Sequence, residues 1–245
     1  MPTSDASEDE GRPDASVDLA AAALDLARGF ADGGTLWCWA PGATRHARHV
    51  AVEFVHPVVT GTRALPAVAL VESDPTEELR TMSRSGDALL VIAGAGAPVA
   101  SLARRAEAWG VTTVWMGAGP PPPDGSVRVD HLLWLTDDAA AWHDGRLVLG
   151  YHLLWELTHV CFEHPGLLTD AAAAGTSGDT AGGAPVCTTC SDEGRLAEVQ
   201  DTAAGDATVR SPRGLETVNT LLVGPVGRGD LVLVHAGTAI SVVDA

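Results

Sequence analysis

The sequence predicts an α/β fold, in which a parallel sheet is covered by helices on both faces, followed by a small OB-like β-barrel. The first part is predicted by five short apolar runs that alternate with segments of helical periodicity. Each run is apolar at nearly every position, as in parallel strands buried on both faces. The second part is predicted by short apolar segments beyond residue 187, which Gly, Pro and Asp separate and which lack helical spacing.

Ten elements are expected to alternate between residues 16 and 168. The expected helices are 16–31, 44–56, 75–83, 98–109 and 147–163. The expected strands are 36–39, 67–71, 88–93, 111–116 and 130–135. Thr44 is expected to cap the second helix.

The last 59 residues are expected to form the barrel. Its expected strands are 196–199, 207–209, 216–219, 230–235 and 240–243. A unit of this size is near the lower limit for a self-sufficient core, so we expect it to be supported by a partner or a ligand.

Composition divides the chain into four segments. Residues 1–15 read as a disordered acidic tail, 16–168 as the α/β domain, 169–186 as a flexible Gly/Ala-rich linker and 187–245 as the barrel.

The charge balance excludes some classes of partner. The chain has 32 acidic residues against 15 basic ones and no lysine, for a net charge of −17. Nucleic acid and anionic membrane surfaces do not attract such a protein. No apolar run approaches the roughly 20 residues that span a bilayer. An acidic N-terminus without an apolar core argues against a secretory signal, and four cysteines do not make a disulfide framework. A cytoplasmic protein with reduced thiols is therefore expected.

The barrel segment opens with a CxxC pair, Cys187 and Cys190, and contains one histidine, His235. By spacing alone the pair could be half of a zinc site, a redox pair or two surface thiols. A zinc site would need two further ligands, and the other two cysteines, Cys38 and Cys161, occur singly in the other domain.

Two segments of this unit carry a family resemblance: CTTCSDE, which begins at Cys187, and GDLVLVHAGTAI, at 229–240. Together they resemble the HypC/HupF hydrogenase formation chaperones over nearly all of 187–245. The resemblance implies that Cys187 and His235 serve an iron centre carrying cyanide and carbon monoxide. It also implies two partners, a HypD-type scaffold protein that supplies the iron fragment and the large subunit of a nickel–iron hydrogenase that receives it. In typical members the cysteine becomes the mature N-terminus, whereas here 186 residues precede it.

The α/β domain carries histidine and glutamate at helical spacing on two expected helices. The second helix has His49, Glu53 and His56; the last has His152, Glu156, His159 and Glu163. Imidazoles and carboxylates that face each other across two helices suit a divalent metal. Such pairs also occur on solvated helix surfaces, so both interpretations remain open.

The segments LWCWAPGATRHARHVAVEFV, at 36–55, and SGDALLVIAGAG, at 85–96, resemble the phosphoheptose isomerase branch of the SIS (sugar isomerase) family. The similarity spans residues 16–164 and lies in the order of the expected elements more than in sequence motifs. It implies that His49 and Glu53 bind a metal, with zinc or nickel as candidates, or transfer a proton.

On the last helix the resemblance makes His159 and Glu163 nearby candidates for catalysis and metal binding. The SIS family grips its sugar phosphate with hydroxyl-rich loops after the first and third strands. Here the loops at 40–43 and 93–97 have no hydroxyl side chain, and only Thr44 remains. We therefore expect that the fold is kept and that sugar-phosphate catalysis is lost.

The leading prediction is a non-enzymatic maturation factor for a nickel–iron hydrogenase. The alternatives are an isomerase for a phosphorylated ketose such as sedoheptulose 7-phosphate, with Glu53 as base, a sugar-phosphate-binding protein, and a metal store or sensor. By analogy with SIS domains, a homo-oligomer that pairs through the helices is also expected.

Overall fold

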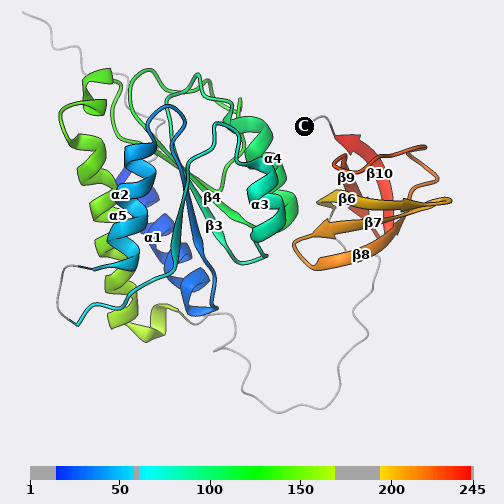
Figure 1. Cartoon of the computed structure of the whole chain (residues 1–245), viewed down its shortest axis with the longest axis horizontal. Helices are drawn as coiled ribbons and strands as arrows, with labels where there is room; N and C mark the ends of the chain where they lie inside the picture. Colours follow the sequence, from blue (N-terminus) through cyan, green and yellow to red (C-terminus); the bar gives the residue numbers. More distant parts are fainter. Residues whose placement is uncertain (1–14, 58–60, 169–193, 244–245) are drawn as a thin grey trace, which may run out of the picture.

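The computed structural model describes residues 15–57, 61–168 and 194–243, which form two domains that lie side by side (Figure 1). The α/β domain contains α1 (Ala15–Ala31), β1 (Leu36–Trp39), α2 (Thr44–Val55), β2 (Ala67–Leu70), α3 (Thr76–Met82), β3 (Ala88–Ile92), α4 (Val99–Trp109), β4 (Thr112–Gly117), β5 (His131–Trp134) and α5 (Arg146–Glu163). Two short 3₁₀ helices, Ala139–Trp142 and Pro165–Leu167, flank α5. The barrel contains β6 (Arg195–Ala203), β7 (Asp206–Ser211), β8 (Gly214–Asn219), β9 (Leu231–His235) and β10 (Thr238–Val243). The predicted linker and all but the last residue of the predicted tail lie outside the described residues. Within the described ranges, no helix has the length and apolar character needed to cross a membrane.

The sheet of the α/β domain has the strand order β2-β1-β3-β4-β5, and every pair is parallel. Its central strands are buried on both faces. In β1, Leu36 and Cys38 enter one apolar cluster, whereas Trp37 and Trp39 enter the other. Because successive side chains of a strand point to opposite faces, a strand covered on both sides must be apolar throughout. The predicted fold class is confirmed.

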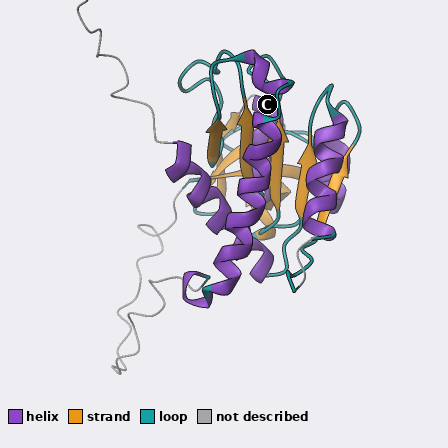
Figure 2. Cartoon of the chain, turned by 90° about the vertical axis from the view of Figure 1, so that its left-hand side faces the viewer, coloured by secondary structure: helices purple, strands orange, loops and turns teal. Residues whose placement is uncertain are grey.

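Helices cover both faces of the sheet (Figures 1 and 2). The core on one face is formed with α1, α2 and α5, and the core on the other with α3 and α4. The predicted cap of α2 is wrong: Thr44 is its first residue, Ala43 is the N-cap, and no side chain caps the helix. A backbone turn starts the helix instead, because the amide of Ala43 donates to Ala40 and that of His46 donates to Ala43.

The second domain is a closed barrel with the strand order β10-β8-β7-β6-β9. All its pairs are antiparallel except β8 with β10, which meet through one pair, Asn219 and Thr238. Small side chains fill the interior: Ala197, Val199, Ala207, Val209, Val218, Val232, Val234 and Ala239. The predicted small β-barrel is therefore confirmed.

The barrel is supported by α3 and α4 of the α/β domain. Leu231 of β9 is fully buried in the apolar cluster that also contains Trp109, and Leu196 and Val243 pack against this cluster. The support that a small barrel requires therefore comes from the same chain.

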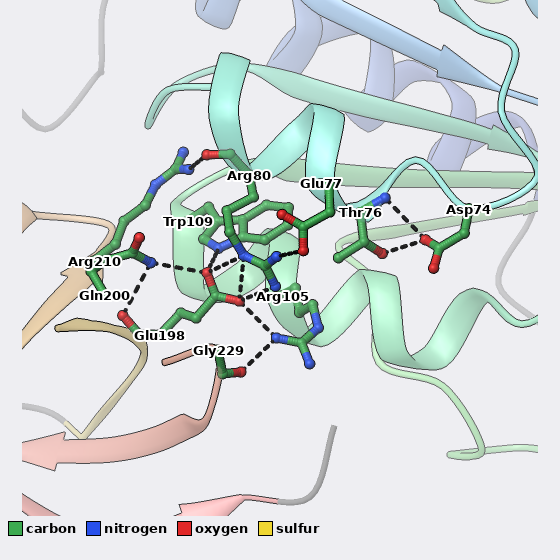
Figure 3. Close-up of polar contacts among 10 residues, drawn as sticks. All are labelled: Asp74, Thr76, Glu77, Arg80, Arg105, Trp109, Glu198, Gln200, Arg210 and Gly229. Carbon is green, nitrogen blue, oxygen red and sulfur yellow. Dashed lines mark hydrogen bonds and ion pairs between the residues drawn. The ribbon is translucent and has the colours of Figure 1, made fainter. Parts of the chain in front are cut away.

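One buried carboxylate, Glu198 of β6, joins the two domains (Figure 3). Its side chain is 0% exposed and accepts hydrogen bonds from Arg80 Nε at 3.0 Å, Arg105 Nη1 at 2.7 Å and Trp109 Nε1 at 2.9 Å. The amide of Gln200 also donates to it. Burial alone raises the pKa of Glu198, but hydrogen bonds led by those from Arg80 and Trp109 outweigh burial and lower it. The carboxylate is therefore charged and fully paired at neutral pH.

Candidate functional site

Three ligand-type side chains converge between α2 and α5. Glu53 Oε1 lies 3.3 Å from His49 Nε2 and 3.8 Å from His152 Nε2, and the two Nε2 atoms are 3.3 Å apart. His49 and Glu53 share one face of α2 because they are four residues apart. His152 reaches the pair because α2 and α5 pack on the same face of the sheet. The site therefore combines two helices that are far apart in the sequence.

The arrangement fits a small divalent cation. Zinc bonds of about 2.0–2.1 Å in tetrahedral geometry set the ligand atoms about 3.3 Å apart, which is close to the separations seen here. Two imidazole nitrogens and one carboxylate oxygen are a donor set that zinc and nickel accept. The side chains are 41%, 22% and 43% exposed for His49, Glu53 and His152, so an ion can reach them from solvent. Among the described residues, no other group of three or more His, Cys, Asp and Glu side chains brings its ligand atoms within 4.8 Å of one another.

A buried tyrosine lies behind this cluster. The hydroxyl of Tyr151 is 2.8 Å from His49 Nδ1 and 3.5 Å from His46 Nδ1. Burial and the nearby charge of Glu53 raise the pKa of Tyr151 to about 12, so the phenol keeps its proton at neutral pH. Burial, together with Arg45 and His49, lowers the pKa of His46 and favours its neutral ring.

The other predicted residues of the two stripes lie elsewhere. His56 is exposed at the C-cap of α2, and Glu156 and Glu163 are exposed on α5. His159 packs on Trp155, with ring centroids 4.4 Å apart. Its Nδ1 and Nε2 lie 2.8 and 3.0 Å from the carbonyl oxygens of Trp155 and Arg63, respectively.

The rise along α5 explains this separation. Seven residues of α-helix advance about 10 Å, so His159 lies well beyond the level of His152 and the cluster. His159 instead lies near Phe54, with ring centroids 6.3 Å apart.

In the barrel, His235 is the last residue of β9 and is half-buried. It pairs with Thr238 across a two-residue turn in which Ala236 and Gly237 both have positive φ, 47° and 74°. Turns of this kind match the twist of a hairpin and hold its ends in register. The predicted ligand Cys187 and its neighbour Cys190 lie outside the described residues.

The two described cysteines are buried and free. Burial raises the pKa of both Cys38 and Cys161, which keeps them protonated. Both sulfurs are enclosed in the α/β domain, so neither is presented at the surface for a site shared with the CxxC pair.

Sequence reasoning did not assign three residues that the fold makes important. His152 was only one member of a stripe, and Tyr151 has no motif, although it is the chain's single tyrosine and precedes His152. Glu198 is the one acid among the apolar residues of 196–199, a pattern that signals a buried, paired charge.

Comparison with known proteins supports the fold of the α/β domain. No protein-family model matches the sequence, and no curated protein sequence matches it. A phosphoheptose isomerase from Francisella tularensis is similar in structure, with a TM-score of 0.51 and 18% identity, over 59% of this chain and 86% of that chain. A phosphoheptose isomerase from Neisseria gonorrhoeae has a TM-score of 0.45 and 22% identity, over 58% of this chain and 85% of that chain. The similarity to the Francisella tularensis enzyme shows that the α/β domain shares the fold of that phosphoheptose isomerase.

Proposed function

We propose that this chain is a maturation factor for a nickel–iron hydrogenase. In this proposal the barrel carries or delivers an iron fragment bearing cyanide and carbon monoxide, which it binds through Cys187. His235 assists as a ligand or as a hydrogen-bond partner. A HypD-type scaffold protein supplies the fragment, and the hydrogenase large subunit receives it.

The observation that carries the proposal is the register between β6 and β9. Arg195, at the start of β6, pairs with Val234, the residue before His235. The described part of the barrel therefore begins on the strand beside the histidine. Cys187 lies eight residues before Arg195, at most about 29 Å of extended chain, so its thiolate can reach His235.

The chemistry of these two residues suits the cargo. A thiolate is a soft ligand that suits iron, and a neutral imidazole on a strand can ligate or donate a hydrogen bond. Binding is a ligand exchange, in which the Cys187 thiol loses its proton to solvent and the sulfur replaces a ligand of the donor. No change in the oxidation state of iron is required.

Infrared spectroscopy of the intact chain tests the proposal directly. Protein purified without oxygen, from cells that make a nickel–iron hydrogenase, is expected to contain about one iron per chain and to show bands of metal-bound cyanide and carbon monoxide. The Cys161→Ala variant, which removes a thiol of the other domain, should keep the bands. Wild-type protein without iron, or iron without these bands, would contradict the proposal.

We also propose that the SIS-like domain binds one divalent ion, zinc or nickel, through His49, Glu53 and His152. The ligand separations and the accessible donors support this assignment. The cluster lies on the α2–α5 face of the sheet, whereas the barrel packs on the α3–α4 face. An ion in this cluster is therefore separate from the described part of the barrel.

Zinc titration is expected to show one tight site per chain. His49→Ala and His152→Ala each remove one of three ligands, so affinity should fall by more than the roughly 10- to 100-fold that outer-sphere changes cause. His56→Ala removes an exposed histidine of the same helical stripe and should leave affinity unchanged. Equal losses in all three variants, or none, would argue against this site.

Sugar-phosphate isomerisation has weaker support. Glu53 beside His49 could move a proton, but a sugar phosphate must also be held. The loops 40–43 and 93–97 follow the neighbouring strands β1 and β3, where such a ligand would bind, and offer only backbone groups. Thr44, the first residue of α2, is the one hydroxyl near them that the sequence resemblance assigns to this role.

A further inference from the structure

Tyr151 contacts the metal cluster without supplying one of its converging ligand atoms. Its side chain is 1% exposed, and its hydroxyl bridges His49 Nδ1 at 2.8 Å and His46 Nδ1 at 3.5 Å. We propose that Tyr151 is a positioning residue for the metal site, which holds the His49 ring with Nε2 facing Glu53 and His152. This inference rests on the metal-binding part of the proposed function.

A bound ion fixes the direction of the hydrogen bond between His49 and Tyr151. An imidazole that ligates through Nε2 carries its proton on Nδ1. The Nδ1–H of His49 then donates to the phenol oxygen of Tyr151. The phenol O–H is then free to donate to Nδ1 of His46 at 3.5 Å, in the tautomer that places the ring proton on the buried Nε2.

In this hydrogen-bond network His46 is buried, whereas His49 is partly exposed. His46 is 6% exposed and packs edge-on against Tyr151 and Trp142, with ring centroids 6.0 and 6.2 Å apart. The His49 side chain is 41% exposed, so packing alone does not enclose its ring. The hydrogen bond from the buried phenol therefore fixes the orientation of the exposed His49 ring, as outer-sphere partners do in metal sites.

The test compares three variants of the full chain, with zinc and cobalt(II) as probes. Tyr151→Phe keeps the buried ring and removes the hydroxyl, and it is expected to weaken zinc binding by about 10- to 100-fold. It should also change the visible absorption of bound cobalt(II), because the orientation of one ligand is released. Thr158→Val removes another buried hydroxyl from α5, one that bonds to the Leu154 carbonyl, and should change neither quantity.

The His49→Ala variant separates two ways of failing. If it retains zinc, the metal site itself is wrong. If it loses zinc while Tyr151→Phe binds zinc and cobalt like the wild type, the positioning role is wrong. Should Tyr151→Phe not fold, the NMR signals of wild-type protein labelled with ¹³C-tyrosine decide, because Tyr151 is the single tyrosine of the chain. Zinc is expected to shift these signals, and unchanged tyrosine signals at saturating zinc would overturn the inference.

Discussion

Cells that depend on this chain for hydrogenase assembly are expected to lose nickel–iron hydrogenase activity when Cys187 is replaced by alanine. Under the proposed function this thiolate is the ligand that holds the iron fragment during transfer. Alanine offers no soft ligand, and the neighbouring imidazole of His235 alone is a poorer match for iron with cyanide and carbonyl ligands. Hydrogen-dependent dye reduction in cell extracts measures the loss.

Two other cysteine variants make the experiment specific. Cys190→Ala removes the second thiol of the CxxC pair and is expected to have a milder effect, because the proposal assigns the iron fragment to the thiolate of Cys187. Cys161→Ala should leave activity near the wild-type level, because this buried cysteine lies in the other domain. Full activity in Cys187→Ala cells would reject the delivery role of the barrel.

The Glu198→Ala variant is expected to lose about 3–5 kcal/mol of stability at the domain interface. The substitution leaves Arg80 and Arg105, only 13% and 16% exposed, without their shared counter-charge. It also removes the acceptor of the buried Trp109 indole N–H. Urea unfolding followed by tryptophan fluorescence measures the change, with the barrel expected to unfold first because it relies on this contact.

Glu77 provides a matched control on the same arginine. Its carboxylate also pairs with Arg80, but its side chain is 82% exposed. Exposed pairs contribute about 0–1 kcal/mol, so Glu77→Ala should be close to neutral. Similar effects of the two substitutions would show that burial does not make the Glu198 contact strong.

The same interface should respond to acid. The folded pKa of Glu198 is lowered, so its contribution to stability is present above the ordinary glutamate pKa of about 4.3 and is lost as the pH falls through the folded value. Glu198→Gln cannot ionise and should lack this component. Acid titration of the two proteins, followed by tryptophan fluorescence, compares them, and an identical pH dependence would contradict the assignment.

Much of the fold could be predicted because its signals are local. The strands of the α/β domain are apolar at nearly every position, and the barrel strands are short and bounded by turn residues. The pairing of His49 with Glu53 was also predictable, because four residues of helix place two side chains on one face. The cap at Thr44 was mispredicted because a backbone turn starts the helix instead of a side chain.

The sequence by itself determined the two-part architecture, the order of its elements and two of the three ligands of the candidate metal site, His49 and Glu53. Only the tertiary structure decided that His152, and not His159, faces His49. The choice depends on the position of α5 along the axis of α2, which is set when the two helices pack. It also decided that Glu198 joins the barrel to α3 and α4, with Arg80, Arg105 and Trp109 as its donors. These contacts link residues about 90 to 120 positions apart, and such pairings arise from docking of whole elements, which no local pattern of side chains specifies.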